Sequence, residues 1–380
     1  MFSRFVAKFC AVLLLAAGLF TGSPGAQSPP TESAPAESTE EGPRPRAVDA
    51  GPVVNQAGET VGRRSLRWQE RVDLTLPYGW RPAQPVARVC KGPDYKARFY
   101  AASYSQGNAV YVEVLALDGH TFPKGTAFRA YFDSRPIPLR PASFGLRGFF
   151  PIGPRTKPGP RTVLFVTEAG PRTRRFSCPM SVTATQFPVY RSSMNLGKFS
   201  NAAAAQDPKA AALIRRSSAR KRQVFVRRTP NAIRARMSHP RDMHKVTSPY
   251  FSTRIKKTYV ILKNGKKRFL KPRVNVHRGL DLKGLTGAPI FALLDGTVAA
   301  AEMMYWEGNH TILDHGDGIF TVYMHQSELL VKAGQRVEAG DLIGRTGATG
   351  AVTGPHLHIA LYMRGIPIQP LSFLSLPVRD

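Results

Sequence analysis

Acidic residues are scarce in this sequence of 380 residues, which has 25 aspartates and glutamates against 54 lysines and arginines. Because the formal charge is +29 at pH 7, we expect polyanions rather than cations as partners. Charge alone does not choose among envelope polymers, anionic lipids and nucleic acid. Hydrophobic residues make up 42% of the chain, which is enough for two ordinary domains and excludes a wholly disordered protein.

Long hydrophobic runs are also absent, apart from one between Phe9 and Phe20. Arg4 and Lys8 precede this run and small residues follow it, which is the layout of a cleavable signal peptide over residues 1–26. The run is short for a membrane span, an uncleaved anchor being the alternative, and no cysteine follows it as a lipoprotein would require. We therefore expect a periplasmic or secreted protein with no stable transmembrane segment in its mature chain.

Cysteine is rare, with three in the chain. Cys10 lies in the expected signal peptide, so the mature chain keeps Cys90 and Cys178. An even pair in an oxidising compartment predicts a disulfide, and two buried free thiols are the alternative. A disulfide between these residues, which are 88 positions apart, would stabilise the fold by roughly 4 kcal/mol.

Large apolar side chains are few in residues 27–65, which are rich in Pro, Ser, Ala and Glu and are expected to form a disordered tether. Residues 66–190 contain short β-prone runs between Gly, Pro, Asn and Asp turns, which predicts an immunoglobulin-like β-sandwich. In "NAVYVEVLAL" the alternation predicts a half-buried strand. Isolated acids in this region are expected on the surface and form no catalytic constellation, namely Asp94, Glu113, Asp118, Asp133 and Glu168.

Acids are nearly missing between Lys209 and Arg273, where 21 lysines and arginines accompany one acid, Asp242. Residues 191–245 are therefore expected to form a basic, partly helical linker, since an alanine-rich stretch precedes the basic clusters. Such clusters could bind anionic envelope polymers, although a solvated surface is the alternative. Export makes nucleic acid an unexpected physiological partner.

Glycine turns separate β-prone runs in residues 246–380, which predicts a second all-β domain. Three short motifs in it carry potential ligands and bases: "HRGLD" with His277 and Asp281, "YMHQS" with His325, and "HLH" with His356 and His358. Side chains at positions i and i+2 of a strand point to the same face. We therefore expect His356 and His358 to converge on one place.

This set of residues suits metal-dependent hydrolysis. Catalytic zinc typically takes three protein ligands from His and carboxylate and keeps a fourth position for water. His277, Asp281 and one histidine of "HLH" would supply those ligands, and the zinc would make the water a usable nucleophile. The two remaining histidines would transfer protons and stabilise the oxyanion.

Residues 275–372 resemble the catalytic domain of the M23 (lysostaphin or LytM type) zinc metallopeptidases. The resemblance extends to the pattern around the motifs, in "HRGLDLKGLTGAPIFALLDGTV", "DHGDGIFTVYMHQSEL" and "GPHLHIAL". It implies that His277, Asp281 and His358 bind one zinc ion per chain, and that His325 and His356 are catalytic. It also implies a LytM-type peptidase domain at residues 246–380.

The resemblance implies an endopeptidase that cleaves stem peptides or cross-links of bacterial peptidoglycan. An inactive LytM protein that binds the wall or activates another hydrolase is the alternative. The region containing "SQGNAVYVEVLAL" is similar to the immunoglobulin-like domain that precedes the peptidase in exported members. The family's F-G-x-R appears here as "FSTR", and a basic insert follows it. His310 and His315 match no functional position and are expected to be structural or surface residues.

Overall fold

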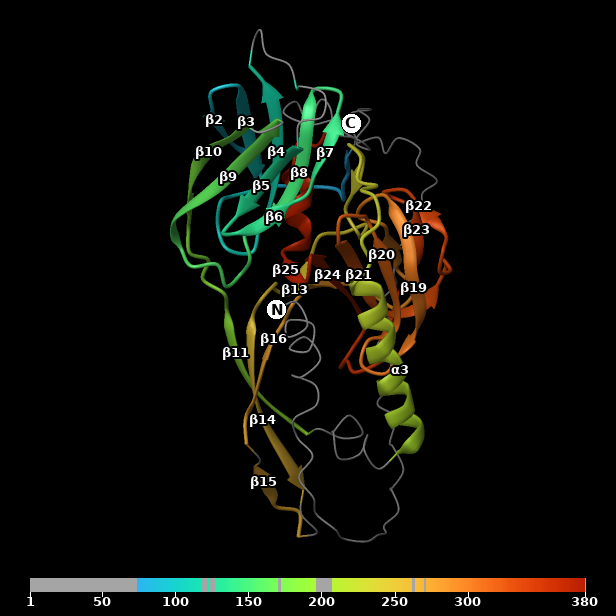
Figure 1. Ribbon diagram of the computed structural model, residues 1–380. Coiled ribbons are helices and arrows are strands. Elements are labelled where there is room, and N and C mark those ends of the chain that lie inside the picture. The colour runs from blue at the N-terminus through green and yellow to red at the C-terminus, as the bar shows by residue number, and fades with distance from the viewer. Residues whose placement is uncertain are drawn as a thin grey trace.

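The computed structural model describes residues 74–117, 122, 127–169, 172–195, 207–261, 264–269 and 271–379. The expected signal peptide over residues 1–26 and the expected tether over residues 27–65 lie outside this part of the chain. The described part is mainly β, as the sequence predicts, and its long α-helix is α3 (Pro208–Phe225) (Figure 1). No helix in this part is both long and apolar enough to cross a membrane.

The N-terminal half of the described chain forms two antiparallel sheets around one core. Within the described residues, the first sheet has the order β2-β3-β4-β8-β7 and the second the order β10-β9-β5-β6. The strands of the first sheet are β2 (Val86–Lys91), β3 (Tyr95–Ala101), β4 (Ala109–Ala116), β7 (Leu139–Ala142) and β8 (Gly145–Pro151). Those of the second are β5 (Ala127–Phe132), β6 (Arg135–Ile137), β9 (Gly159–Ala169) and β10 (Arg172–Val182). Phe99, Val112 and Phe165 come from both sheets and fill the space between them, as in a β-sandwich.

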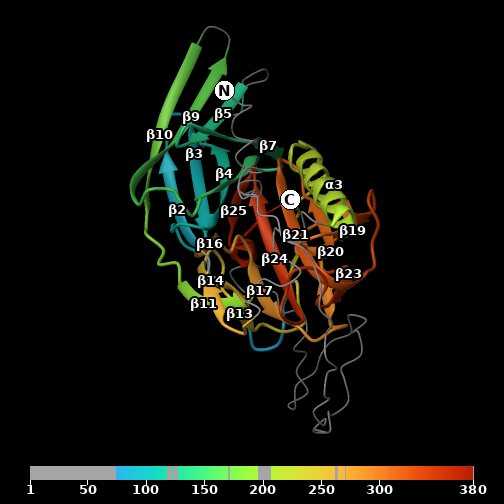
Figure 2. The ribbon, with the colours of Figure 1, turned by 90° about the horizontal axis from the view of Figure 1, so that it is seen from below.

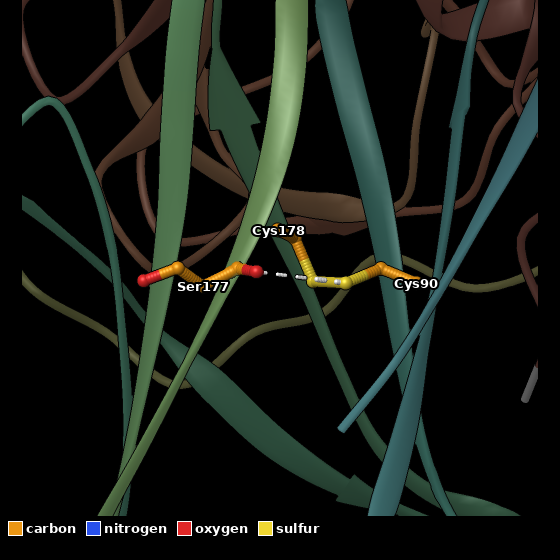
Figure 3. Close-up of a disulfide and its surroundings, with 3 residues drawn as sticks. All are labelled: Cys90, Ser177 and Cys178. Atoms are coloured by element: carbon orange, nitrogen blue, oxygen red, sulfur yellow. Dashed lines mark hydrogen bonds between the residues drawn. A yellow bond between two sulfur atoms is a disulfide. The ribbon is translucent and has the colours of Figure 1, made fainter.

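A disulfide joins the two sheets of this sandwich. Cys90 on β2 is bonded to Cys178 on β10, with the sulfur atoms 2.13 Å apart (Figure 3). The two residues are 88 positions apart in sequence, so the bond closes a loop that contains most of the sandwich.

Strand β4 differs from the half-buried strand that its alternation predicts, because both of its faces are buried. Val112 and its neighbours on one face lie in the sandwich core, while Tyr111 on the other face packs against Phe149 and the C-terminal segment. Glu113 lies on this second face and is 1% exposed, with Nε of Arg379 2.5 Å from its Oε1. The prediction that Glu113 is a surface residue was therefore wrong, because residues far along the chain cover it.

The C-terminal half is built on one large sheet, whose main path among the described residues has the order β13-β17-β24-β21-β20-β19-β22. Its strands are β13 (Val246–Ser248), β17 (Leu280–Lys283), β18 (Pro289–Phe291), β19 (Gly296–Met304), β20 (Gly308–Asp314), β21 (Ile319–Leu329), β22 (Arg336–Val337), β23 (Leu342–Thr346), β24 (His356–Met363) and β25 (Ile366–Ile368). The 3-10 helix η3 (Pro370–Ser375) follows. Phe373 of η3 stacks on Phe149 of β8, so η3 lies between the sandwich and the large sheet (Figure 1).

Helix α3 covers the other face of the large sheet. Asp207 caps its N-terminus by accepting a hydrogen bond from the backbone N–H of Lys209, which satisfies a donor that has no partner within the helix. Val224 packs with Ile312, Phe320 and other apolar residues of the sheet. In Figure 2 the helix lies beside β19 and β20. The basic residues of α3 need not be buried, because a few apolar positions on one face are enough to dock a helix.

The segment after α3 also belongs to the folded body. Ile233 and Met237 are fully buried, and β12 (Met237–Ser238) pairs in parallel with β1 (Leu74–Thr75). Residues 191–245 were predicted to be a basic, partly helical linker; α3 agrees with the helical part, while the residues from Ile233 to Ser238 are packed into the folded body. Widely spaced apolar residues dock this segment, and their spacing has no helix or strand period that a sequence reading could detect.

A smaller sheet extends from the lower end of the molecule in Figure 1. In it, β11 (Val189–Asn195) runs parallel to β14 (Thr253–Ile261), which pairs with β15 (Lys267–Phe269) and β16 (Arg273–Val276). The basic insert noted in the sequence forms β14 and β15. Since β16 ends at Val276, this sheet leads directly to His277.

Candidate metal centre and catalytic site

Three side chains converge at the junction of β16, β17 and β24. Asp281 on β17 lies opposite His358 on β24 in the antiparallel pair, and His277 precedes β17. Nε2 of His277 lies 2.9 Å from Oδ1 of Asp281 and 3.0 Å from Nδ1 of His358. Nδ1 of His358 is 2.8 Å from the same Asp281 oxygen. These residues form a group that could hold a metal ion.

Gly279, inside the "HRGLD" motif, allows this close approach. A Cβ atom at this position would lie 2.6 Å from Nε2 of His358 and 2.5 Å from the carbonyl oxygen of Ile359. Because real Cβ atoms do not approach other atoms so closely, any side chain at residue 279 would push β17 and β24 apart. The glycine of this motif is therefore required by its packing against His358.

The protein backbone orients the ring of His277. Its Nδ1 lies 3.0 Å from the carbonyl oxygen of Pro249, which can only accept a hydrogen bond, so Nδ1 carries the proton. In the neutral ring Nε2 then has a lone pair directed at a carboxylate oxygen of Asp281. Two such acceptor atoms 2.9 Å apart attract each other only through a proton or a cation between them. The donor set of two imidazoles and one carboxylate thus fits a metal ion.

Arg254 of β14 holds the second oxygen of the Asp281 carboxylate. Its Nη2 donates to Oδ2 of Asp281 at 2.9 Å and to Oγ of Ser248 at 2.6 Å. Arg254 was not among the site residues predicted from sequence. The sequence contained a signal for Arg254, because this residue is the arginine of "FSTR", the segment that aligns with the family's F-G-x-R. Only the fold shows that its partner is Asp281.

His325 and His356 border this cluster. Nε2 of His356 is 3.7 Å from Oδ1 of Asp281, and the ring centroids of His325 and His356 are 5.0 Å apart. Nδ1 of His325 lies 3.0 Å from the carbonyl oxygen of Thr349, and Nδ1 of His356 lies 2.9 Å from that of Gly354. All five residues predicted from the sequence motifs therefore lie together in the structure.

The backbone at His325 has an uncommon conformation. Its φ angle is +64°, in the left-handed region that side chains rarely adopt. The backbone N–H of His325 donates to the carbonyl oxygen of Glu307 at 2.9 Å, which helps to hold this turn. Such strain persists only where neighbouring contacts impose it, and it is frequent at functional sites.

Burial and the neighbouring charges set the protonation of this site. Burial opposes ionisation of Asp281, but the close contacts of its carboxylate with the rings of His277 and His358 outweigh it and hold the pKa of this carboxyl well below its ordinary value. Burial lowers the pKa of His358, and it lowers the pKa of His325 to about 4, with a contribution from the charge of His358. A neutral His358 can donate a lone pair to a cation, and an ionised Asp281 supplies the negative charge.

His310 and His315, which lie in the same domain but match no motif, are structural. His310 is fully buried, and its Nδ1 lies 2.8 Å from the carbonyl oxygen of Glu302. His315 is also fully buried and contacts the carbonyl oxygen of Asp295 and the hydroxyl of Thr321. Neither is among the residues of the metal-ligand group.

A comparison with models of protein families agrees with a metal-dependent peptidase site. Residues 275–370 match the model of peptidase family M23, so this part of the chain is an M23 peptidase domain. It contains all five histidine and aspartate residues of the site.

Particular relatives share this domain. Peptidoglycan DD-endopeptidase ShyA of Vibrio cholerae is 41% identical over 100 residues, which are 26% of this chain and 23% of that protein. A metalloprotease of Haemophilus influenzae is 43% identical over 101 residues, which are 26% of this chain and 21% of that protein. A solved structure from Pseudomonas aeruginosa described as peptidase M23 has a TM-score of 0.47 and 22% identity, over 72% of this chain and 96% of that one. The chain thus spans about a quarter of the length of the curated relatives it matches.

Proposed function

We propose that the protein is a zinc-dependent endopeptidase that hydrolyses peptide bonds of bacterial peptidoglycan. The observation that carries this proposal is the meeting of His277 Nε2, Asp281 Oδ1 and His358 Nδ1 within 2.8 to 3.0 Å of one another, beside two further histidines. Two imidazoles and a carboxylate are the ligands that a catalytic zinc ion takes. Relatives named peptidoglycan DD-endopeptidase support the substrate class.

Zinc would supply Lewis-acid chemistry that makes water a nucleophile near neutral pH. The chain's own residues would do the rest. Because Nδ1 of His325 and of His356 donate to backbone carbonyls, each ring keeps the Nε2 lone pair to accept a proton. Once protonated, either ring becomes a donor for the oxyanion and for the leaving amine. Arg254 holds the Asp281 carboxylate in its ligating orientation.

The remaining parts of the chain are compatible with a function in the cell envelope. A signal peptide would direct the protein to the periplasm or out of the cell. The basic residues between Lys209 and Arg273 fit anionic envelope polymers and the carboxylates of stem peptides. The N-terminal sandwich, which we propose is immunoglobulin-like, would position the peptidase domain on the wall.

The test is digestion of purified peptidoglycan followed by mass spectrometry of the muropeptides. We expect cross-linked stem peptides to be cleaved, EDTA to abolish cleavage, and added zinc to restore it. Matched digests with His358→Ala should release nothing. Binding to peptidoglycan without new muropeptides, at stoichiometric zinc content, would contradict the enzyme and support an inactive wall-binding protein.

A further inference from the structure

A cavity of about 680 Å³ lies where the sandwich, the segment after α3 and the large sheet meet. The sandwich contributes Arg147 of β8, the segment after α3 contributes Arg227 and residues 229–234, and the sheet contributes residues of β19, β20 and β22. The cavity exists only because these three parts pack together. Its most frequent lining residue is arginine, at positions 147, 227, 234 and 336.

The cavity is separate from the histidine cluster. Asp314 lines the cavity at one end of β20, while Gly308 at the other end adjoins Thr349, whose carbonyl oxygen lies beside His325. A strand of seven residues is about 20 Å long. A ligand in the cavity therefore would not occupy the site of peptide hydrolysis.

Three of the four arginines have no side-chain hydrogen bond or ion pair among the described residues, although Arg234 lies close enough to the Asp295 carboxylate to interact with its charge. Arg147 is held, because it donates to the carbonyl oxygens of Arg379 and Ile233. The guanidinium groups of Arg227, Arg234 and Arg336 make no hydrogen bond or ion pair with any residue that the structure describes.

The acid in the cavity wall does not compensate for them. Asp314 is buried, and its Oδ1 accepts hydrogen bonds from the hydroxyl of Thr229 and the backbone N–H of Gly316. Even with Asp295 near Arg234, two carboxylates against four arginines leave an excess of positive charge in a concave site. Such a site raises the local concentration of anions.

We propose that this cavity binds an anionic ligand through a phosphate group, with Arg227, Arg234 and Arg336 as its partners. The planar guanidinium fork pairs with two oxygens of a phosphate at once. A phosphate group carries about −1.5 to −2 charges and three acceptor oxygens, so it satisfies several arginines where a carboxylate satisfies one. The ligand would be a phosphate ester or free phosphate, and it would bind whether or not the peptidase is active.

The test is isothermal titration calorimetry of the full-length chain with inorganic phosphate and, separately, with glycerol phosphate. We expect one saturable site, and at least tenfold weaker binding to an Arg234→Gln/Arg336→Gln variant. Acetate at the same ionic strength should give no saturable heat. Tighter binding of glycerol phosphate than of phosphate would identify a phosphate ester as the ligand, and the reverse order would identify free phosphate.

The matched control is an Arg216→Gln/Arg268→Gln variant, which loses the same charge from two exposed residues outside the cavity lining. It should bind phosphate like the unaltered chain, and both variants should keep the thermal unfolding midpoint of that chain. Equal weakening in the two variants, or equal binding of acetate, would show nonspecific charge screening and overturn the proposal. Absence of saturable binding up to about 10 mM phosphate would overturn it as well.

Discussion

Asp281 is the residue on which the contacts of the metal centre converge. Its Oδ1 faces His277 and His358, and its Oδ2 accepts from Arg254. The two oxygens therefore differ in role, since Oδ1 is available to the proposed cation and Oδ2 is held by the surrounding protein. His325 and His356 differ from the ligands because their Nδ1 atoms are engaged by backbone carbonyls outside the cluster.

The first prediction separates ligands from proton-transfer groups. We expect His358→Ala to lose zinc and activity together, because two ligands do not hold a catalytic ion firmly. We expect His356→Ala or His325→Ala to keep zinc but to lower turnover by roughly 100-fold or more. Elemental analysis and peptidoglycan digestion measure the two quantities. Stoichiometric zinc in purified His358→Ala would refute the ligand assignment.

The second prediction concerns the pH dependence of stability. Burial lowers the pKa of His315 from 6.5 to about 4. The unfolded state therefore binds more protons than the folded state between these values, so the free energy of unfolding falls as the pH falls through this range. The loss amounts to about 3 kcal/mol. We expect urea unfolding to show it in the unaltered chain and to show a smaller loss in His315→Gln. Equal pH slopes in both proteins would rule out this origin.

At the scale of elements, strands and the helix supply contacts to the site that no motif contains. Strand β14 brings Arg254 to Asp281, although β14 belongs to the smaller basic sheet. Helix α3 docks on the large sheet and places Lys221 against Glu307, whose carbonyl oxygen holds the backbone N–H of His325. Elements outside the family motifs therefore support both the proposed ligands and His325.

The third prediction tests β14. Replacing Arg254 by Met should weaken zinc binding by roughly 10- to 100-fold, because groups that orient ligands typically contribute this much. The matched control is Lys257→Met, which removes an exposed charge from the same strand. Zinc affinity measured by competition with a chelator reports the effect. If Arg254→Met bound zinc as tightly as the control variant, Arg254 would form an ion pair with Asp281 without orienting it for the metal.

The fourth prediction tests α3. Burial opposes ionisation of Glu307, but Lys221 outweighs it and lowers the pKa of this carboxyl. Lys221→Met would leave a buried carboxylate without its cation, so we expect the free energy of unfolding to fall by about 3 kcal/mol. We also expect turnover to fall about tenfold with zinc retained, because His325 moves.

A Lys221→Met/Glu307→Gln variant should recover part of the stability, since it removes the unpaired charge. Arg216→Met, at an exposed position of the same helix, serves as the control. Denaturant unfolding and digestion kinetics measure both effects. Unchanged turnover in Lys221→Met would show that α3 stabilises the sheet without positioning His325.

At the scale of the whole molecule, the sandwich and the peptidase domain form one packed body in the described residues. The backbone N–H of Gln369 donates to the carbonyl oxygen of Gly107 at 2.8 Å, and Phe373 stacks on Phe149. The arginine-lined cavity arises at a junction of the same two halves. The core between the two sandwich sheets is nevertheless separate from the core of the large sheet, and the disulfide packs in the former.

The fifth prediction uses this separation. A Cys90→Ser/Cys178→Ser variant should lose roughly 4 kcal/mol of stability, because the disulfide no longer restricts the unfolded chain. Zinc content and turnover at low temperature should not change, since the bond is remote from the metal centre. Calorimetry and metal analysis test both expectations, and reduction of the unaltered chain provides a second route to the same state. An unchanged unfolding midpoint would contradict the prediction.

Local sequence patterns were enough to predict the residues of the candidate site. The motifs around His277, His325 and His356 carry the potential ligands and bases, and the period of two in a strand is enough to bring His356 and His358 to one face. Glycine turns and β-prone runs predict the mainly β fold, because these signals act over a few residues.

Only the tertiary structure decided which distant groups meet. Glu113 is buried because Arg379 reaches it from 266 positions away, and Arg254 contacts Asp281 because β14 and β16 pair. The apolar residues after α3 are too widely spaced to show a period, yet they dock that segment. Contacts of this kind depend on the packing of whole elements, which the periodicity of a short segment does not encode.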